Sequence, residues 1–159
     1  FLTSRMGAAY VHGVQKEGIG VSLKHYCANN EEHIRMCIDS VVDERALREI
    51  YLAAFEEVVK EAQPTTVMCS YNRIDGKYLA ENKRLLTDIL RDEWGFKGMV
   101  VTDWGVKNDP VKEVKAGNDM KMHCGYPEDL KVAFDNGDLT RADLELCAKR
   151  ILDMFMKLV

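Results

Sequence analysis

Hydrophobic residues follow two different spacings along this chain, and each spacing predicts one kind of element. Short runs rich in apolar and β-branched residues occur at residues 20–26, 65–71 and 98–103, and they predict buried strands of a parallel sheet. A weaker run at residues 118–123 predicts a fourth strand. Between these runs the apolar positions recur every three to four residues, which is typical of amphipathic helices.

Helices are therefore expected before, between and after the strands. Residues 4–16 and 109–116 predict two of them, and a third is expected over residues 82–95, from the cap Asn82 to the stop Gly95. The longest begins after Asp43, a plausible N-cap. Its apolar face is predicted to comprise Leu47, Ile50, Tyr51, Ala54, Phe55 and Val58.

Two more helices are expected at the C-terminal end of the chain. The first ends near Gly137, and the second starts at Thr140, with Asp143 in a capping-box position. The inward stripe of the second helix is predicted to comprise Leu144, Cys147, Ile151 and Phe155.

One helix followed by four strand–helix units predicts an α/β fold with parallel strands and helices packed outside them. Neighbouring parallel strands would bring the polar and aromatic residues at their exits to one rim, as in a TIM-barrel-like (β/α)8 domain. A complete barrel takes about 250 residues, so four strands correspond to about half of one. Residues 1–159 are accordingly predicted to be a single fragment, half of such a barrel.

The composition narrows the classes of partner. The chain has 159 residues, of which 47% are hydrophobic and 30% charged, as in ordinary globular domains. A net charge of −4 and the absence of a visible basic patch argue against nucleic acid as a partner. No apolar run approaches the roughly 20 residues that span a bilayer, and no signal peptide opens the chain, so no membrane partner is expected.

Cysteine usage indicates the compartment. Five cysteines, without a Cys-Xaa-Xaa-Cys pair, indicate free thiols in a reduced cytoplasm. His123 beside Cys124 is the only near pair of metal-ligand residues, and neither a metal nor a cofactor is expected. Residue 1 is expected to lie inside a longer chain, because Phe1-Leu2-Thr3-Ser4 is not a natural start.

Asp103 is the most informative single residue. It follows an apolar strand and precedes Trp104, so a carboxylate and a flat aromatic surface would stand together at a strand exit. This combination suits a sugar, since one group can react while the ring covers an apolar face. Without further context, Asp103 could equally be a helix N-cap.

Five segments carry a more specific signal. They are Lys24-His25-Tyr26, Asp43-Glu44-Arg45-Ala46-Leu47-Arg48-Glu49-Ile50-Tyr51-Leu52, Met68-Cys69-Ser70-Tyr71-Asn72, Glu93-Trp94-Gly95-Phe96-Lys97-Gly98 and Val101-Thr102-Asp103-Trp104-Gly105. In this order and spacing they resemble the motifs of glycoside hydrolase family 3, which includes β-glucosidases, β-xylosidases and β-N-acetylglucosaminidases. The resemblance implies the C-terminal half of the catalytic barrel of a retaining, exo-acting β-glycosidase, which hydrolyses O-glycosidic bonds at non-reducing ends of a carbohydrate substrate.

The same resemblance assigns roles to residues. Asp103 matches the nucleophile, which attacks the anomeric carbon while a second, protonated carboxyl about 5 Å away protonates the leaving oxygen. The positive charge of Lys24 nearby would favour the ionised form of Asp103. The substrate-binding positions implied by the resemblance are Lys24, His25, Met68, Tyr71 and Trp104.

Some features depart from the family pattern. Thr102 stands where Ser is usual, and Lys121 is unusual within its segment and is expected to point outward. The loop after Lys24-His25 has no Gly-His-Gly sequence and no Asp-Xaa-His dyad, which favours a β-glucosidase or β-xylosidase over an N-acetylglucosaminidase. The first barrel half and the α/β sandwich domain that bears the acid are missing, so the fragment alone is predicted to be inactive and to self-associate through open barrel edges.

Other interpretations remain open. Lys24 could form a Schiff base in an aldolase-type barrel, or the alternation could belong to a doubly wound nucleotide-binding fold, although no GxGxxG or GxxxxGK[ST] motif occurs. The piece could also be a catalytically inert half-barrel. The candidate site residues other than Asp103 could serve only in packing or at a solvated strand end. Glu31, Glu32 and Arg35 are interpreted as an ion pair that fixes the loop after the first strand, and His123 has no evident partner.

Overall fold

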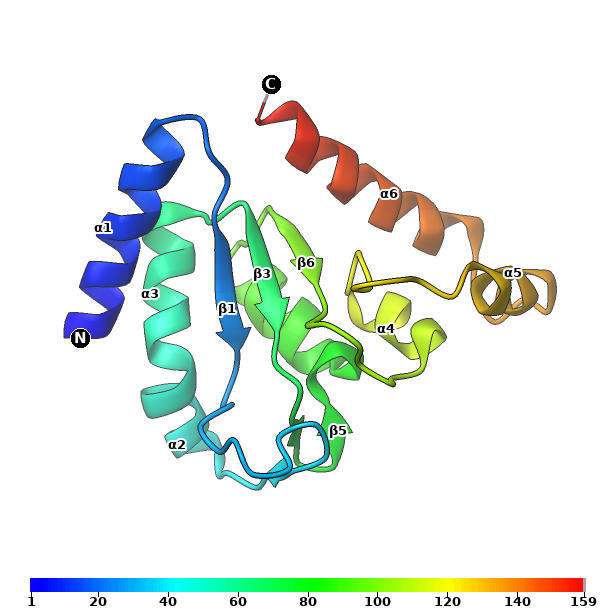
Figure 1. Ribbon diagram of the computed structural model, residues 1–159, viewed down its shortest axis with the longest axis horizontal. Coiled ribbons are helices and arrows are strands. Elements are labelled where there is room, and N and C mark those ends of the chain that lie inside the picture. Colours follow the sequence, from blue (N-terminus) through cyan, green and yellow to red (C-terminus); the bar gives the residue numbers. More distant parts are fainter. Residues whose placement is uncertain (159) are drawn as a thin grey trace.

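A three-stranded parallel sheet, in the order β1-β3-β6, forms the centre of the molecule (Figure 1). The computed structural model describes residues 1–158. The strands are β1 (Ser22–Tyr26), β3 (Thr66–Cys69) and β6 (Met99–Val101). Thr66 pairs with Ser22 on one side and with Met99 on the other, so the strands begin at one level and end at the same edge of the sheet. The predicted parallel α/β alternation is confirmed.

Two long helices lie side by side next to β1 (Figure 1). They are α1 (Leu2–Lys16) and α3 (Ala53–Ala62), and they meet through a small apolar cluster of Ala8, Val11, Val58 and Ala62. Short α2 (Glu44–Ala46) leads into this second helix, and the Asp43 carboxylate accepts a hydrogen bond from the Ala46 amide at 3.0 Å. The predicted N-cap is therefore confirmed.

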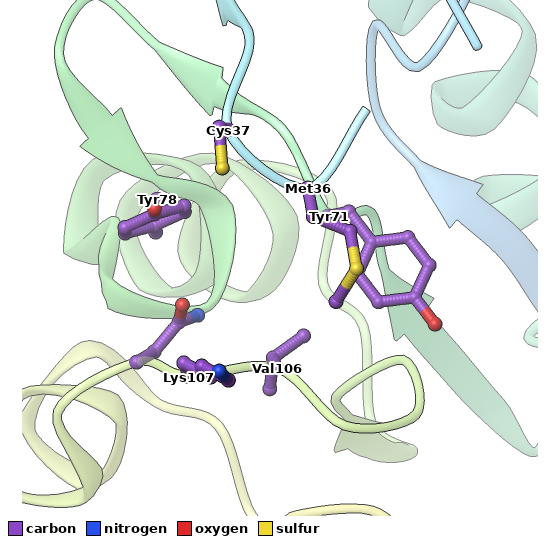
Figure 2. Close-up of a pocket in the computed structure, with 7 residues that line it drawn as sticks. Met36, Cys37, Tyr71, Tyr78, Val106 and Lys107 are labelled. Carbon is purple, nitrogen blue, oxygen red and sulfur yellow. The ribbon is translucent and has the colours of Figure 1, made fainter. Parts of the chain in front are cut away.

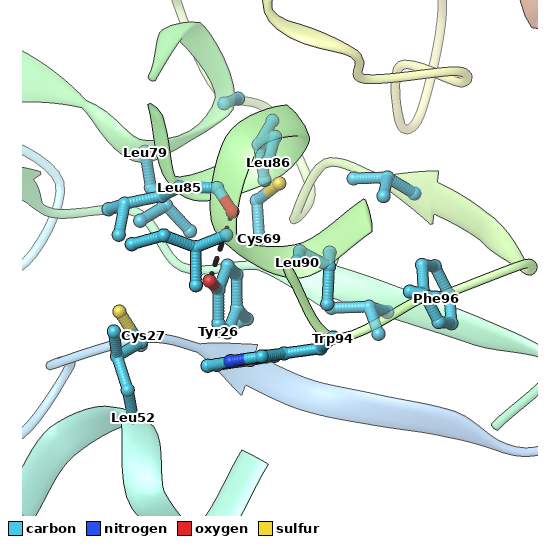
Figure 3. Close-up of a cluster of buried hydrophobic side chains, with 14 of the residues drawn as sticks. Tyr26, Cys27, Leu52, Cys69, Leu79, Leu85, Leu86, Leu90, Trp94 and Phe96 are labelled. Atoms are coloured by element: carbon cyan, nitrogen blue, oxygen red, sulfur yellow. Dashed lines mark hydrogen bonds between the residues drawn. The ribbon is translucent and has the colours of Figure 1, made fainter. Parts of the chain in front are cut away.

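Tyr26 is at the centre of the main core (Figure 3). It is fully buried at the end of β1, and its hydroxyl donates a hydrogen bond to the Leu85 carbonyl at 3.1 Å. Its ring meets Phe55 and Trp94 edge-on, with centroid separations of 5.3 and 6.0 Å. A buried tyrosine hydroxyl needs a partner, and helix η3 (Arg84–Glu93) supplies it. One side chain thus joins β1 to the helices that pack on it.

The helix that follows Asp43 buries a different face from the predicted one. Ile50 is 67% exposed, so its assignment to the inward face is wrong. Residues Leu47–Leu52 form the π-helical segment η1, in which bonding from residue i to i+5 replaces the α-helical pattern. Leu47 and Leu52, five residues apart, are consequently the buried pair.

A second, smaller sheet was not predicted. It consists of β2 (Asp39–Ser40), β4 (Arg73–Ile74) and β5 (Lys77–Tyr78), in the order β2-β4-β5. Strands β4 and β5 are joined by a two-residue hairpin loop, with positive φ at both Asp75 and Gly76, as such loops require. The Asp39 carboxylate accepts the Gly76 amide at 2.9 Å and holds the hairpin in place.

The predicted fourth strand over residues 118–123 is reduced to a single parallel bridge between Val101 and Met120. The amides of Asp119 and Met120 both donate to the Val100 carbonyl, at 3.0 and 3.2 Å, so the chain bends instead of extending along β6. The Thr102 hydroxyl accepts the Met122 amide at 2.8 Å and keeps this segment beside the sheet edge.

Asp119 joins three elements through a buried ionic network. Its carboxylate lies 2.6 Å from the Arg91 guanidinium and 3.1 Å from that of Arg150, and it also accepts the Val100 amide at 2.8 Å. The Asp119 side chain has no solvent exposure. Since an unpaired buried charge is costly, this network fixes how the last helix meets the sheet.

Three helices follow β6. They are α4 (Pro110–Ala116), α5 (Pro127–Asp135) and α6 (Arg141–Met156). The predicted capping box between Thr140 and Asp143 is present, and Cys147 is buried as expected. Phe155 is 54% exposed, so its inward assignment is wrong: no described residue covers this end of the helix deeply enough to bury it. Within residues 1–158, no helix has the length and apolar character needed to cross a membrane.

We expect the 159-residue chain, produced alone, to self-associate. Leu152, Phe155 and Met156 on α6 are 62%, 54% and 76% exposed, and β1 has no partner on its outer side among the described residues. Exposed apolar surface and open strand edges favour association. Sedimentation velocity should show species larger than a monomer.

Replacing both Phe155 and Met156 with Glu should shift that distribution toward the monomer. The matched control places Glu at Ala142 and Ala148, two exposed positions of the same helix, and should leave the distribution unchanged. A monomer at the highest soluble concentration would contradict the prediction.

Candidate active site

Asp103 lies just beyond β6 at the edge where the three parallel strands end. The residue is only 8% exposed, and its Oδ1 atom accepts the backbone amide of Trp104 at 2.7 Å. The apolar β6 brings the chain through the core, and the chain turns at Gly105, where φ is 69°. The result is a carboxylate that is held in place but reached from one side.

His25 approaches this carboxylate from β1. Its Nε2 atom lies 3.3 Å from Oδ2 of Asp103, and its side chain is 27% exposed. Burial lowers the pKa of His25, and the negative charge of Asp103 opposes this shift while the positive charge of Lys24 adds to it. A neutral imidazole is therefore favoured near pH 7, and it can donate or accept a hydrogen bond without neutralising Asp103.

Tyr71 comes to the same place from the loop after β3. Its hydroxyl donates to the Trp104 carbonyl at 2.7 Å. Burial raises the pKa of Tyr71, and the neighbouring Asp103 carboxylate raises it further, so the phenol stays protonated. The loop itself is tied to the end of β1, because the Ser70 hydroxyl donates to the Cys27 carbonyl at 2.9 Å. His25, Tyr71 and Asp103 thus converge from three different strands.

The other predicted site residues surround this group less closely. Lys24 is exposed, and its positive charge lowers the pKa of His25. Met68 is half-buried in β3, whereas its neighbours Val67 and Cys69 are fully buried against the helices. Because side chains alternate along a strand, Met68 points to the opposite face of the sheet. Trp104 follows Asp103 and is 58% exposed.

Two contacts were missed by the sequence analysis. The ring of His123 stacks on Trp104, with centroids 5.3 Å apart and an angle of 18° between the planes. The Arg35 guanidinium lies over the Tyr71 ring, 4.9 Å from its centroid. The expected ion pair between Arg35 and Glu32 is present at 3.2 Å. For the stacking of His123 on Trp104, the only signal in the sequence was the position of His123 near a predicted strand exit.

Lys121 does not point outward as expected. Its ammonium group is buried, 2.7 Å from the Glu113 carboxylate of α4, and it also donates to the Asn108 carbonyl at 3.2 Å. Burial raises the pKa of Glu113, and the charge of Lys121 opposes that shift. The inward direction follows from this buried carboxylate, which requires a positive partner. The pair anchors the loop that follows Asp103.

A mostly apolar cavity of about 200 Å³ lies next to Tyr71 (Figure 2). Tyr71 borders it with its ring, and the hydroxyl points away from it. The other lining residues are Met36, Cys37, Tyr78, Val106, Lys107 and Asn108. Within the part of the chain that the structure describes, no group of three or more His, Cys, Asp or Glu side chains is arranged to hold a metal ion.

Comparison with known proteins gives a family match and close relatives. The family model described as "Glycosyl hydrolase family 3 N terminal domain" matches residues 1–154. Thermostable beta-glucosidase B of Acetivibrio thermocellus is 46% identical over 162 residues, which cover 99% of this chain and 22% of the relative. An exo-alpha-(1->6)-L-arabinopyranosidase of Bifidobacterium breve is 47% identical over 158 residues, covering 99% of this chain and 21% of that protein.

Solved structures show the same likeness. Beta-glucosidase 3B from Thermotoga neapolitana, in complex with alpha-D-glucose, superposes with a TM-score of 0.94 at 40% identity, covering 97% of this chain and 23% of that one. A beta-glucosidase from Streptomyces venezuelae in complex with D-glucose gives a TM-score of 0.90 at 33% identity, covering 98% and 22%. The chain spans about a fifth of the length of the curated relatives it matches.

The charges around His25 give a test that does not depend on turnover. Asp103 raises the pKa of His25 and Lys24 lowers it. We therefore expect Asp103→Asn to lower this pKa further and Lys24→Met to raise it, as measured by NMR titration of the histidine ring protons. The ring signals of His12, on α1, serve as the internal control. Shifts of the same sign in both variants would contradict the arrangement.

Proposed function

The chain belongs to glycosyl hydrolase family 3, and on that premise we propose that it forms the second half of the catalytic barrel of a retaining, exo-acting β-glycosidase of the β-glucosidase type. The observation that carries the proposal is the convergence of His25, Tyr71 and Asp103 at the carboxyl ends of three parallel strands. Parallel α/β barrels carry their chemistry at this edge. The barrel's first half and the domain that bears the acid are assigned to parts of the protein outside this chain.

Asp103 acts as the nucleophile in this proposal. Its carboxylate attacks the anomeric carbon of the sugar, and a glycosyl–enzyme ester forms as the leaving oxygen takes a proton from a second carboxyl. Water then hydrolyses the ester, with net retention of configuration. The hydrogen bond from the Trp104 amide holds Oδ1 of Asp103, which leaves Oδ2, on the side of His25, as the attacking atom.

The neighbours of Asp103 are assigned to sugar binding. Neutral His25 and the Lys24 ammonium group hydrogen-bond ring hydroxyls and hold the sugar in the geometry of the transition state. Tyr71 presents a protonated hydroxyl next to the nucleophile. Met68 and the exposed Trp104 supply apolar contact to the sugar.

The substrate class is a β-linked glucoside in the first instance. The beta-glucosidases from Thermotoga neapolitana and Streptomyces venezuelae, at 40% and 33% identity, were solved in complex with glucose. A second candidate is an α-L-arabinopyranoside, because the Bifidobacterium breve arabinopyranosidase is as similar to this chain as the A. thermocellus glucosidase. Hydrolysis rates on nitrophenyl β-D-glucopyranoside, β-D-xylopyranoside and α-L-arabinopyranoside would rank the candidates.

Loss of the nucleophile should abolish turnover in the full-length protein. We expect Asp103→Asn to lower kcat by a factor on the order of 10³ or more, because no other group can form the glycosyl ester. The folded state should persist, as circular dichroism would show. Residual activity within about tenfold of the wild-type enzyme would contradict the assignment.

A chemical control separates nucleophile loss from misfolding. In Asp103→Gly, azide can enter the space of the missing carboxylate and attack the same carbon. Turnover of nitrophenyl β-glucoside should then recover with azide and yield the α-glucosyl azide, which NMR identifies. The same treatment of Asp109→Gly, a helix N-cap away from the site, should produce no azide adduct.

The 159-residue chain alone should show no measurable glycosidase activity. It contributes the nucleophile but is proposed to lack the general acid, and acid–base catalysis contributes about 10²–10⁴-fold. Release of nitrophenol by the purified chain, compared with its Asp103→Asn variant, measures this directly. Turnover that depends on Asp103 would place the acid within the chain and overturn this part of the proposal.

A further inference from the structure

Arg35 contacts the site without reaching the carboxylate. It lies in the loop between β1 and β2, and its guanidinium carbon is 4.9 Å from the centroid of the Tyr71 ring. A cation over the face of an aromatic ring is attracted by the ring's electron distribution. The contact connects a loop residue to the side chain whose hydroxyl lies next to Asp103.

We infer that Arg35 is a positioning residue that holds the Tyr71 ring in place beside the nucleophile. The inference rests on the proposed function, since it assigns Arg35 a part in the reaction of Asp103. Nothing in the sequence motifs assigns this role, because Arg35 was expected only to form an ion pair with Glu32.

The Tyr71 ring needs such a restraint. It borders the cavity of about 200 Å³ (Figure 2), so close packing does not fix it on that side. Its hydroxyl donates to the Trp104 carbonyl and lies next to the Asp103 carboxylate. Contacts at the hydroxyl alone leave the ring free to turn about its long axis, and the guanidinium over its face opposes that rotation.

Electrostatics agree with this geometry. The charge of Arg35 acts on both neighbours of Asp103, lowering the pKa of Tyr71 against the effect of burial and lowering the pKa of His25 together with burial. Arg35 therefore adds to the effect of burial on the pKa of His25, and it limits the rise in the pKa of Tyr71. One residue of the loop between β1 and β2 thus influences the two groups that flank Asp103.

The alternative is that Arg35 only anchors its own loop. It lies 3.2 Å from the Glu32 carboxylate, and the two side chains are 42% and 72% exposed. Ion pairs that are this exposed contribute little to stability. Removing the carboxylate with Glu32→Gln deletes the ion pair and keeps the guanidinium over Tyr71, which makes it the matched control.

The test uses the full-length enzyme and nitrophenyl β-D-glucopyranoside. We expect Arg35→Met to lower kcat about fivefold, the factor that about 1 kcal/mol of lost interaction gives, with KM changed less than about twofold. Arg35→Lys keeps a cation and should recover most of kcat. Glu32→Gln should retain wild-type kcat, and all three variants should unfold at the wild-type temperature.

A double-mutant cycle shows whether Arg35 acts through Tyr71. In a Tyr71→Ala background, Arg35→Met should cause no further loss of kcat. The inference is overturned by an unchanged kcat in Arg35→Met, by an equal loss in Glu32→Gln, or by an undiminished loss in the Tyr71→Ala background. Those outcomes leave the proposed function intact, whereas a wild-type enzyme inactive on all three nitrophenyl glycosides overturns both.

Discussion

Parallel pairing of β1, β3 and β6 from a common starting level places all three strand exits at one edge of the sheet. Ser22, Thr66 and Met99 stand side by side at the start of the three strands, so the strands also leave the sheet together. A register shift of one residue would turn every side chain of a strand to the other face. The pairing of β1 with β3 shifts by one residue between Leu23 and Tyr26, in the stretch that holds His25, and there His25 meets Asp103 at 3.3 Å although the two lie far apart in the sequence.

Buried polar contacts fix the loops that follow the strand ends. The Cys27 carbonyl accepts hydrogen bonds from the Ser70 hydroxyl and the Asn72 side-chain amide, which joins the exits of β1 and β3. The buried pair of Glu113 and Lys121 fixes the loop after Asp103 in a comparable way. In the low-dielectric interior, such groups must keep their partners, so the loops of the site have little freedom. The edge that carries Asp103 is therefore organised by polar contacts built on an apolar sheet.

Strand positions and helix starts could be predicted from the sequence because they depend on residues that are close together in the chain. Apolar runs identified β1, β3 and β6, and the side chains of Asp43 and Thr140 marked helix starts through hydrogen bonds to amides a few residues away. The family motifs identified Asp103, and its nearest neighbours in space, His25 and Tyr71, were among the predicted site residues. Both the α/β alternation and the chemical character of the strand exits could thus be derived from one chain.

Local patterns in the sequence identified the strands of the main sheet, most of the helices and the residues at the strand exits, but not the second sheet or the shortened fourth strand. Other features became visible only in the folded chain. Ile50 turns outward because Leu47–Leu52 form the wider π-helical segment η1. Lys121 turns inward because the buried carboxylate of Glu113 lies beside it, and the Arg35 guanidinium contacts the Tyr71 ring from a different loop. The difference lies in the distance along the chain over which each interaction acts. Spacing and capping act within a few residues, whereas the direction of a long polar side chain depends on which charge or ring the fold brings near it.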